Sequence, residues 1–437
     1  MSLKSLLMPV VSQHLLSRDT LLRRRARLER ERQASGQPHR VLYFHQVDDP
    51  YSALAASCLA RFTQRYEVTL TPHLVAPPAD AAAPAREQLI AYSRRDAQRL
   101  ARRHGLHFQD AGAQPDPGAA ALAAAMLLAA IEERRFHTLA GHLSACLWHE
   151  PAQLARFINP LAVPQPADPT AVDSHVTAST ALRRKLGHYL GATFYYAGEW
   201  YWGIDRLHHL ERRLQELGAA RPGVCDLMFP PAEDLAHPVP VPDPPTIDFF
   251  VSFRSPYTAI VARRVFELGR LTGAPVRPRI VLPMVMRGLP VPGEKRSYIA
   301  ADAAREAHLR GIPFGRVNDP VGRPVERGVA LVDYARRMGR EQAYIEAFLE
   351  GAWARGIDAG SDRGLRRIVE TAGLDWGEAR ACLRDDSWRE GVERNRAEMF
   401  ALGLWGVPSF RVRDVAVWGQ DRLWAIQDEV LRGTSAA

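Results

Sequence analysis

The clearest hydrophobic pattern in the chain is a short apolar run followed at once by an amphipathic segment. Residues 247–253 are mostly β-branched or aromatic, as in a buried strand. Across residues 260–270 the apolar side chains recur at helical spacing, and arginine and glutamate occupy the opposite face. Pro256 lies between the two parts and suits the first turn of a helix, because proline has no N–H to donate. The pattern therefore predicts a strand, a tight turn and a helix.

Ser255 is the predicted N-cap residue of this helix. Free backbone N–H groups converge at a helix N-terminus, so a hydroxyl there lies where an anion or a thiolate is favoured. Serine is also a common N-cap with no further role. The local pattern leaves both interpretations open.

An earlier stretch repeats the motif. The letters F-x-x-x-x-x-P-Y-S-A at residues 44–53 match F-x-x-x-x-x-P-Y-T-A at residues 250–259, so that Pro50 corresponds to Pro256, 206 residues later. The same offset relates Tyr92, Asp96, Arg99, Gly105 and Phe108 to Tyr298, Asp302, Arg305, Gly311 and Phe314. Toward the end of each copy the offset is 216, and relates Gly187, Phe194 and Trp202 to Gly403, Phe410 and Trp418. Agreement at so many positions indicates two copies of one domain.

These copies define the predicted domain organisation. The first spans residues 39–219 and the second spans residues 246–433. Residues 220–245 lie between them and are rich in proline, which predicts a semi-rigid extended linker. Residues 1–38 hold many arginines interspersed with glutamates, which predicts a basic N-terminal helical extension.

Each copy follows one order of predicted elements. A strand and a helix are followed by a second strand at residues 68–74 or 275–282, then by several helices, a hairpin and a final helix. The hairpin is clearest at residues 409–418. This is a thioredoxin-type arrangement with helices inserted. The predicted fold class is therefore α/β, with two tandem thioredoxin-like domains that each contain an inserted all-helical subdomain, as in DsbA.

Composition narrows the function classes. The chain of 437 residues suits two or three domains, and its 46% hydrophobic content is typical of a globular protein. The formal net charge of +8 comes from arginines spread along the chain, and no zinc-finger, basic-zipper or RNA-recognition signature occurs, so nucleic-acid binding is not predicted. The apolar residues 1–16 are interrupted by Pro9 and are too short to span a bilayer, so no transmembrane segment is predicted.

Cysteine usage points to a reducing compartment. The four cysteines form no C-x-x-C pair and match no zinc spacing; they are Cys58, Cys146, Cys225 and Cys382. Neither a metal site nor a disulfide framework is predicted, and the expected location is the cytoplasm.

Three motifs in the second copy carry a family resemblance. They are D-F-F-V-S-F-R-S-P-Y-T at residues 248–258, G-V-P-S-F at residues 406–410 and W-G-Q-D-R-L at residues 418–423. In this order and separation, the motifs resemble those of kappa-class glutathione transferases and 2-hydroxychromene-2-carboxylate isomerases, which are relatives of the DsbA-type oxidoreductases. The turn reads S-P-Y-T where DsbA-type enzymes have C-x-x-C, so dithiol redox chemistry is not expected.

The resemblance implies a catalytic role for Ser255, whose hydroxyl would hydrogen-bond the sulfur of glutathione and favour its thiolate. Val407 would offer its backbone to this cofactor beside a cis bond to Pro408. Gln420 and Asp421 would hold the γ-glutamyl end, with helix capping as the alternative. Lys295 is a candidate anion contact, and a solvated basic position is its alternative.

The implied activity is that of a glutathione-dependent isomerase or transferase acting on an unsaturated, aromatic-derived acid. A bound thiolate would add to a conjugated double bond, allow rotation and leave again. The stretch M-V-M-R-G-L-P-V-P at residues 284–292 lacks an asparagine usual in the family, so the substrate stays open. A non-catalytic thioredoxin-like scaffold that binds a partner is the alternative function.

The first copy departs further from the family. Asp49 stands in the place of Ser255, and Ala192 stands in the place of Pro408. A carboxylate would repel a thiolate, so no thiol chemistry is expected in this copy. Two arrangements remain open for the protein: an internal pseudo-dimer of the two copies, and a homodimer.

Overall fold

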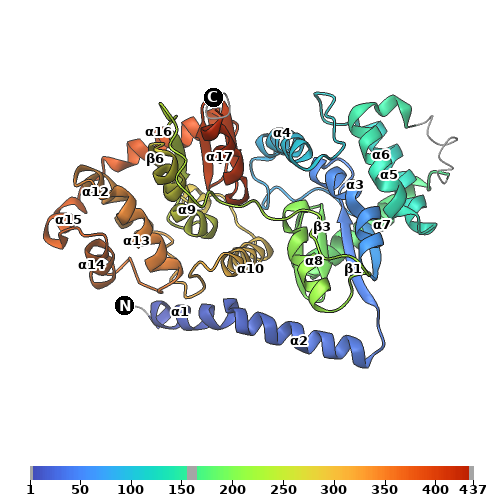
Figure 1. The fold of residues 1–437 in the computed structure, drawn as a ribbon, viewed down its shortest axis with the longest axis horizontal. Coiled ribbons are helices and arrows are strands. Elements are labelled where there is room, and N and C mark those ends of the chain that lie inside the picture. The colour runs from blue at the N-terminus through green and yellow to red at the C-terminus, as the bar shows by residue number, and fades with distance from the viewer. Residues whose placement is uncertain (1–2, 155–164, 433–437) are drawn as a thin grey trace. The chain divides into compact units, whose positions relative to one another are not determined.

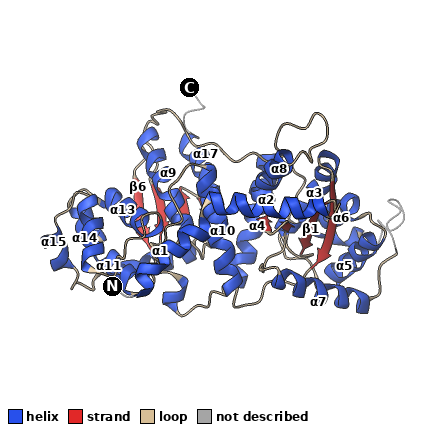
Figure 2. Ribbon diagram, turned by 90° about the horizontal axis from the view of Figure 1, so that it is seen from below, coloured by secondary structure: helices blue, strands red, loops and turns tan. Residues whose placement is uncertain are grey.

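The computed structural model describes residues 3–154 and 165–432, and Figure 1 shows its fold. The chain divides into two compact units. The C-terminal unit comprises Met1–Arg24, Ala232–Val291 and Ile299–Ala437, and the N-terminal unit comprises Arg25–Pro231 and Pro292–Tyr298. Figure 2 shows strands surrounded by helices in both units. The boundary between Pro231 and Ala232 falls within the predicted linker.

The C-terminal unit is built on a four-stranded mixed sheet. The strands are β5 (Ile247–Val251), β6 (Val276–Ile280), β7 (Ser409–Val412) and β8 (Val415–Trp418), in the order β6-β5-β7-β8. β5 and β6 are parallel, whereas β5–β7 and β7–β8 are antiparallel. The helix α9 (Pro256–Thr272) connects β5 to β6, since parallel neighbours need a crossover. The predicted strand, turn and helix are therefore present.

Most of the remaining structure of this unit is helical; of α10 (Gly293–Leu309), only the residues from Ile299 on belong to it. Two of its helices, α16 (Trp388–Ala401) and α17 (Leu423–Leu431), contact the sheet. The segment between β6 and α16 is helical: η3 (Met284–Arg287), α10 (Gly293–Leu309), α11 (Arg323–Ala330), α12 (Val332–Arg337), α13 (Glu341–Trp353), α14 (Asp362–Thr371) and α15 (Trp376–Cys382). A short 3-10 helix, η4 (Gln420–Arg422), precedes α17.

Aromatic side chains join the sheet to the inserted helices. On the sheet, Phe249 of β5 stacks on Phe410 of β7, with ring centroids 5.2 Å apart. Phe253, at the end of the apolar run, stacks on Phe348 of α13 at 4.1 Å. All four rings are fully buried. The core therefore holds the turn after β5 between the sheet and the helical insertion.

The N-terminal unit has a sheet with the same strand order and directions. Its strands are β1 (His39–His45), β2 (Val68–Leu74), β3 (Thr193–Tyr196) and β4 (Glu199–Trp202), in the order β2-β1-β3-β4. β1 and β2 are parallel, and the other pairs are antiparallel. The helices of this unit are α3 (Pro50–Arg65), α4 (Arg86–His104), α5 (Pro117–Glu132), α6 (Phe136–His149), α7 (Pro169–Lys185) and α8 (Leu207–Glu216), with the 3-10 helices η1 (Pro151–Gln153) and η2 (Ile204–Arg206).

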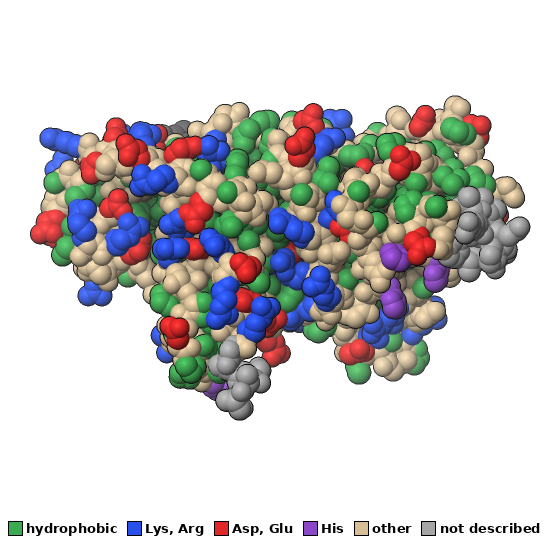
Figure 3. All heavy atoms as spheres, turned by 90° about the horizontal axis from the view of Figure 1, so that it is seen from above, with side chains coloured by type: hydrophobic (Ala, Val, Ile, Leu, Met, Phe, Trp, Pro, Cys, Tyr) green, Lys and Arg blue, Asp and Glu red, His purple; other side chains and the backbone are tan. Residues whose placement is uncertain are grey.

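The predicted basic extension forms two helices, α1 (Leu3–Leu16) and α2 (Arg18–Ala34). The first packs on the C-terminal unit, where the Val317 N–H donates to the Ser12 hydroxyl at 2.9 Å. Charged side chains of both signs are interspersed on the face shown in Figure 3. No helix among the described residues combines the length and the apolar character needed to cross a membrane.

We expect Phe253→Ala to lower the free energy of unfolding by about 3–5 kcal/mol, because it removes a buried ring and leaves a cavity. Urea denaturation would measure this. The control Phe253→Leu, which refills part of the volume, should lose less than half as much. A loss below about 1 kcal/mol for the alanine variant would show that this ring does not anchor the turn.

Candidate functional site

Ser255 lies at the turn between β5 and α9. It is the N-cap of α9, with extended backbone angles, and its side chain is 8% exposed. The Ser255 hydroxyl oxygen accepts the Thr258 N–H at 3.1 Å, and the hydroxyl donates to the Val407 carbonyl at 3.2 Å. The prediction that Ser255 caps this helix is confirmed. The second bond brings in a residue 152 positions away, which no local pattern indicated.

The loop that carries Val407 is tightly packed. Among the described residues, the Val407–Pro408 bond is the cis peptide. A Cβ on Gly406 would lie 2.7 Å from the Trp418 indole nitrogen, so the backbone approaches β8 as closely as glycine allows. The Gly419 N–H then donates to the Pro408 carbonyl at 2.9 Å. These contacts hold the Val407 carbonyl in front of the α9 N-terminus.

Arg254, next to Ser255, has a partner that sequence reasoning missed. Its guanidinium donates two hydrogen bonds to the Asp319 carboxylate, both at 2.8 Å. Both side chains are partly buried. A bidentate ion pair between arginine and a carboxylate is among the stronger polar contacts in proteins. Because the two residues are 65 positions apart, the sequence alone held no signal for the pair.

Tyr257 fixes the first turn of α9 against α10. Its hydroxyl donates to the Asp302 carboxylate at 2.8 Å, and Arg305 donates to the other oxygen at 2.6 Å. Asp302 is 1% exposed. The N-terminal unit has the same contacts at the repeated positions, where Tyr51 and Arg99 donate to Asp96 at 2.9 and 3.3 Å.

Gln420 has buried partners within its own unit. Its side chain is 1% exposed, and its amide nitrogen donates to the Glu306 carboxylate at 2.9 Å. Its amide oxygen accepts from the Arg264 guanidinium at 3.1 Å. The Gln420 side chain thus joins η4 to α9 and α10. Asp421, the next residue, lies 3.4 Å from Arg422 and is partly exposed.

Lys295 belongs to the N-terminal unit, although it was predicted as an anion contact for the second copy. Its ammonium donates to the Ala82 carbonyl at 2.7 Å and lies 5.7 Å from the centre of the Tyr189 ring. Burial lowers the pKa of Lys295 to about 8. Ser255, Val407, Pro408, Gln420 and Asp421 all belong to the C-terminal unit.

The corresponding turn of the N-terminal unit is closed by its own side chains. Asp49 caps α3, and one of its carboxylate oxygens accepts both the Ser52 N–H at 2.9 Å and the Ser52 hydroxyl at 2.8 Å. Gly191 occupies the place of Val407, and a Cβ there would lie 2.6 Å from Cβ of Gln46. The following residue, Ala192, has a positive φ of 53°. This turn therefore leaves no room at the position where Val407 has a side chain.

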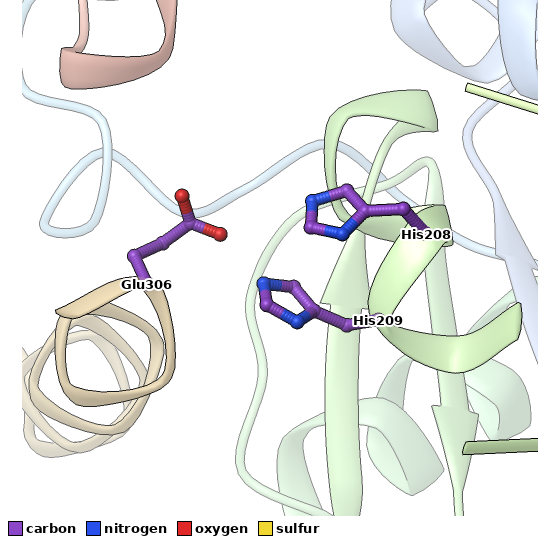
Figure 4. Close-up of side chains that lie close together, drawn as sticks. All are labelled: His208, His209 and Glu306. Carbon is purple, nitrogen blue, oxygen red and sulfur yellow. The ribbon is translucent and has the colours of Figure 1, made fainter. Parts of the chain in front are cut away.

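His208 and His209 are neighbours on α8, with ring centroids 4.0 Å apart (Figure 4). Both are buried in the N-terminal unit. Glu306, also drawn in Figure 4, belongs to the C-terminal unit, so we infer no metal site from these three residues.

The C-terminal half is similar to known proteins. Residues 246–431 match the family model of the DSBA-like thioredoxin domain. The match agrees with a DsbA-like thioredoxin fold of the α/β class in this half, which its motifs predicted. Relatives matched over this half include a 2-hydroxychromene-2-carboxylate isomerase of Sphingobium xenophagum, 26% identical over 43% of this chain and 98% of the relative. Another, from Pseudomonas putida, is 23% identical over 43% of this chain and 94% of the relative.

A solved structure of 2-hydroxychromene-2-carboxylate isomerase is also similar. It is 22% identical, covers 43% of this chain and 95% of its own, and aligns with a TM-score of 0.38.

The partly buried Asp49 carboxyl makes the stability of the fold depend on pH. Burial raises its pKa to about 6, so between about pH 4 and pH 6 the unfolded chain releases the proton that the folded chain keeps. Stability therefore falls as the pH rises through this window, by about 3 kcal/mol in all. We expect Asp49→Asn to remove this fall and to raise the thermal unfolding midpoint at pH 8.

Asp168→Asn is the matched control for this measurement. Asp168 caps α7 but is exposed, and hydrogen bonds from Thr170 lower its pKa. Its charged form stabilises the fold above the unfolded pKa, so removing the charge should lower the midpoint at pH 8. An Asp49→Asn variant less stable than the wild type at pH 8 would contradict the prediction.

Proposed function

We propose that the C-terminal unit is a glutathione-dependent isomerase or transferase that acts on an unsaturated, aromatic-derived acid. The isomerase relatives support the proposal because the match covers nearly their whole length. The observation that carries it is the Ser255 hydroxyl, held at the α9 N-terminus by the Thr258 N–H and directed at the Val407 carbonyl. A small-molecule acid is the substrate class in this proposal.

The Ser255 hydroxyl can donate a hydrogen bond to a thiolate without a change in the backbone. The hydroxyl oxygen keeps the Thr258 N–H as its donor, while rotation about the Cβ–Oγ bond redirects the hydroxyl hydrogen from Val407 to a sulfur. The donated hydrogen bond and the positive end of α9 both favour the charged form of a thiol, so they lower its pKa. Bound in this way, glutathione would supply a nucleophile that adds to a conjugated double bond and leaves after rotation.

Dithiol exchange is not supported at this turn, because Ser255 and Thr258 occupy the positions of the two cysteines in C-x-x-C. Cys382 of the same unit lies at the end of α15, where its sulfur is 4.0 Å from the Arg337 guanidinium. The four cysteines are free thiols, which supports a reducing compartment, and we propose the cytoplasm.

We propose further that the N-terminal unit is a second, diverged copy of the thioredoxin-like domain. The equal strand orders and the repeated contacts of Tyr51 with Asp96 and Tyr257 with Asp302 support this. In this copy Asp49 takes both donors of Ser52, and Gly191 packs against Gln46. We infer that it lacks thiol chemistry.

We expect Ser255→Ala to lower kcat/KM about 10- to 100-fold with glutathione and 2-hydroxychromene-2-carboxylate, because a hydrogen bond to a charged group contributes roughly 1.5–3 kcal/mol. The thiol pKa of bound glutathione, followed by the ultraviolet absorbance of the thiolate, should rise by about 1–2 units. Calorimetry of the wild type with glutathione tests binding directly. No measurable heat would exclude glutathione as the cofactor.

Ser361→Ala is the matched control. Ser361 caps α14 in the same unit, and its hydroxyl accepts the Gly364 N–H at 3.1 Å. Loss of either cap should cost a similar stability, about 0.5–2 kcal/mol. Only the Ser255 variant should change turnover and the thiol pKa. Equal turnover in the wild type and Ser255→Ala would exclude a catalytic role for this hydroxyl.

A further inference from the structure

The N-terminal unit contains a buried cation that pairs with no carboxylate among the residues that the structure describes. Arg183 lies in the last turn of α7 and is 2% exposed. One terminal nitrogen of its guanidinium donates to the Ala76 carbonyl at 3.0 Å. The other terminal nitrogen and Nε have no hydrogen-bond partner among the described residues. Burial, and secondarily the charge of Arg184, lower the pKa of Arg183 to about 10, so the group remains charged at neutral pH.

His188 adds a second donor that lacks a partner. Its Nδ1 accepts the Leu190 N–H at 3.1 Å, so the ring proton of the neutral form lies on Nε2. Nε2 is buried and has no partner among the described residues. Burial, and then the positive charge of Arg183, lower the pKa of His188 to about 3, so the ring is neutral at physiological pH. The two side chains therefore present only donors.

Such an arrangement costs free energy unless something accepts these hydrogen bonds. Leaving a charged group buried and incompletely paired destabilises a protein by several kcal/mol. A buried, unpaired donor costs a further 1–3 kcal/mol. An acceptor-rich anion would meet both requirements at once, because it supplies the missing charge and the missing lone pairs.

The C-terminal unit shows that the fold does not need these polar groups. Gly187 and Gly403 correspond in the repeat, and both have positive φ after the equivalent helices α7 and α16. The offset of 216 residues that relates these glycines also relates Arg183 to Met399 and His188 to Leu404. Both apolar side chains are 0% exposed. One unit thus packs two apolar residues where the other buries a cation and an imidazole.

Polar side chains continue along the inner face of α7. The helical spacing puts His175, Ser179 and Arg183 on one face. Ser179 bonds to Nδ1 of His73 at 3.2 Å, and Nε2 of His73 has no partner among the described residues. The Leu74 N–H donates to the His175 ring at 3.2 Å. Unpaired nitrogen atoms therefore recur between β2 and α7.

Aromatic rings surround the His188 imidazole. Tyr189 stacks on it at 5.3 Å, Trp200 lies at 4.7 Å, and Tyr298 meets it edge-on at 4.4 Å. All of these residues belong to the N-terminal unit. Rings of this kind suit an apolar or aromatic group attached to the anion.

We propose that Arg183 and His188 form a binding site for a small organic monocarboxylate, its carboxylate on the two side chains and its apolar part against the rings around His188. The positive charge of Arg183 suits the negative charge of a carboxylate. Inorganic phosphate has no apolar part to pack against the rings around His188. The site lies in the N-terminal unit and is independent of the function proposed for Ser255.

The first experiment uses the unaltered protein. Thermal unfolding is followed with millimolar benzoate, with benzamide as its neutral isostere, and with acetate and inorganic phosphate. We expect benzoate to raise the unfolding midpoint by about 2–4 °C, acetate to raise it less, and benzamide and phosphate to leave it unchanged. No rise with benzoate would show that solvent alone satisfies Arg183 and would overturn the proposal. A rise with phosphate but not benzoate would also overturn it.

Variants locate the effect. Arg183→Met introduces the residue found at the equivalent position of the C-terminal unit, so it should fold, and we expect its affinity for benzoate to fall at least tenfold. Arg184→Met removes a neighbouring exposed charge and should keep the response to benzoate. An equal response in Arg183→Met and in the wild type would overturn the assignment. If Arg183→Met does not fold, the comparison of benzoate with benzamide on the wild type decides.

Discussion

The hydrogen bond from the Ser255 hydroxyl to the Val407 carbonyl joins the two parts of the candidate site. One partner is the N-cap of α9, and the other precedes the cis bond that leads into β7. The Phe253 ring, packed on Phe348, holds the turn from one side. The Tyr257 hydroxyl, bonded to Asp302, holds it from the other. The chemistry proposed for Ser255 depends on this support, because a donor stabilises a thiolate only where its position is fixed.

The two units have sheets of the same strand order and differ in their polar side chains. At the turn after the first strand, Ser255 presents a hydroxyl, whereas Asp49 is occupied by both donors of Ser52. Near the ends of α7 and α16 the two units differ again. The N-terminal unit buries the cation Arg183 there, whereas the C-terminal unit buries the apolar Met399. In our proposals, a few side chains at these positions determine what each unit binds.

Much of the architecture was predictable from residue order. The strands, the cap at Ser255 and the order of elements follow local periodicity, and the structure contains them. The side-chain partners were less predictable. The ligand contact expected of Gln420 stays a prediction, and no sequence pattern indicated that its amide bonds to Glu306 and Arg264 from distant helices. Lys295 was expected beside the second copy and instead bonds to the Ala82 carbonyl.

The sequence by itself determined the secondary structure around the site and the correspondence of its positions, because hydrophobic period, proline and capping residues act over a few neighbours. Only the tertiary structure decided which polar groups meet. Arg254 pairs with Asp319, 65 positions away in the chain. Arg183 bonds to the Ala76 carbonyl, 107 positions away, and within the described ranges no carboxylate pairs with it. Those contacts form when the core packs, and hydrogen-bonding groups then have only the neighbours that packing supplies.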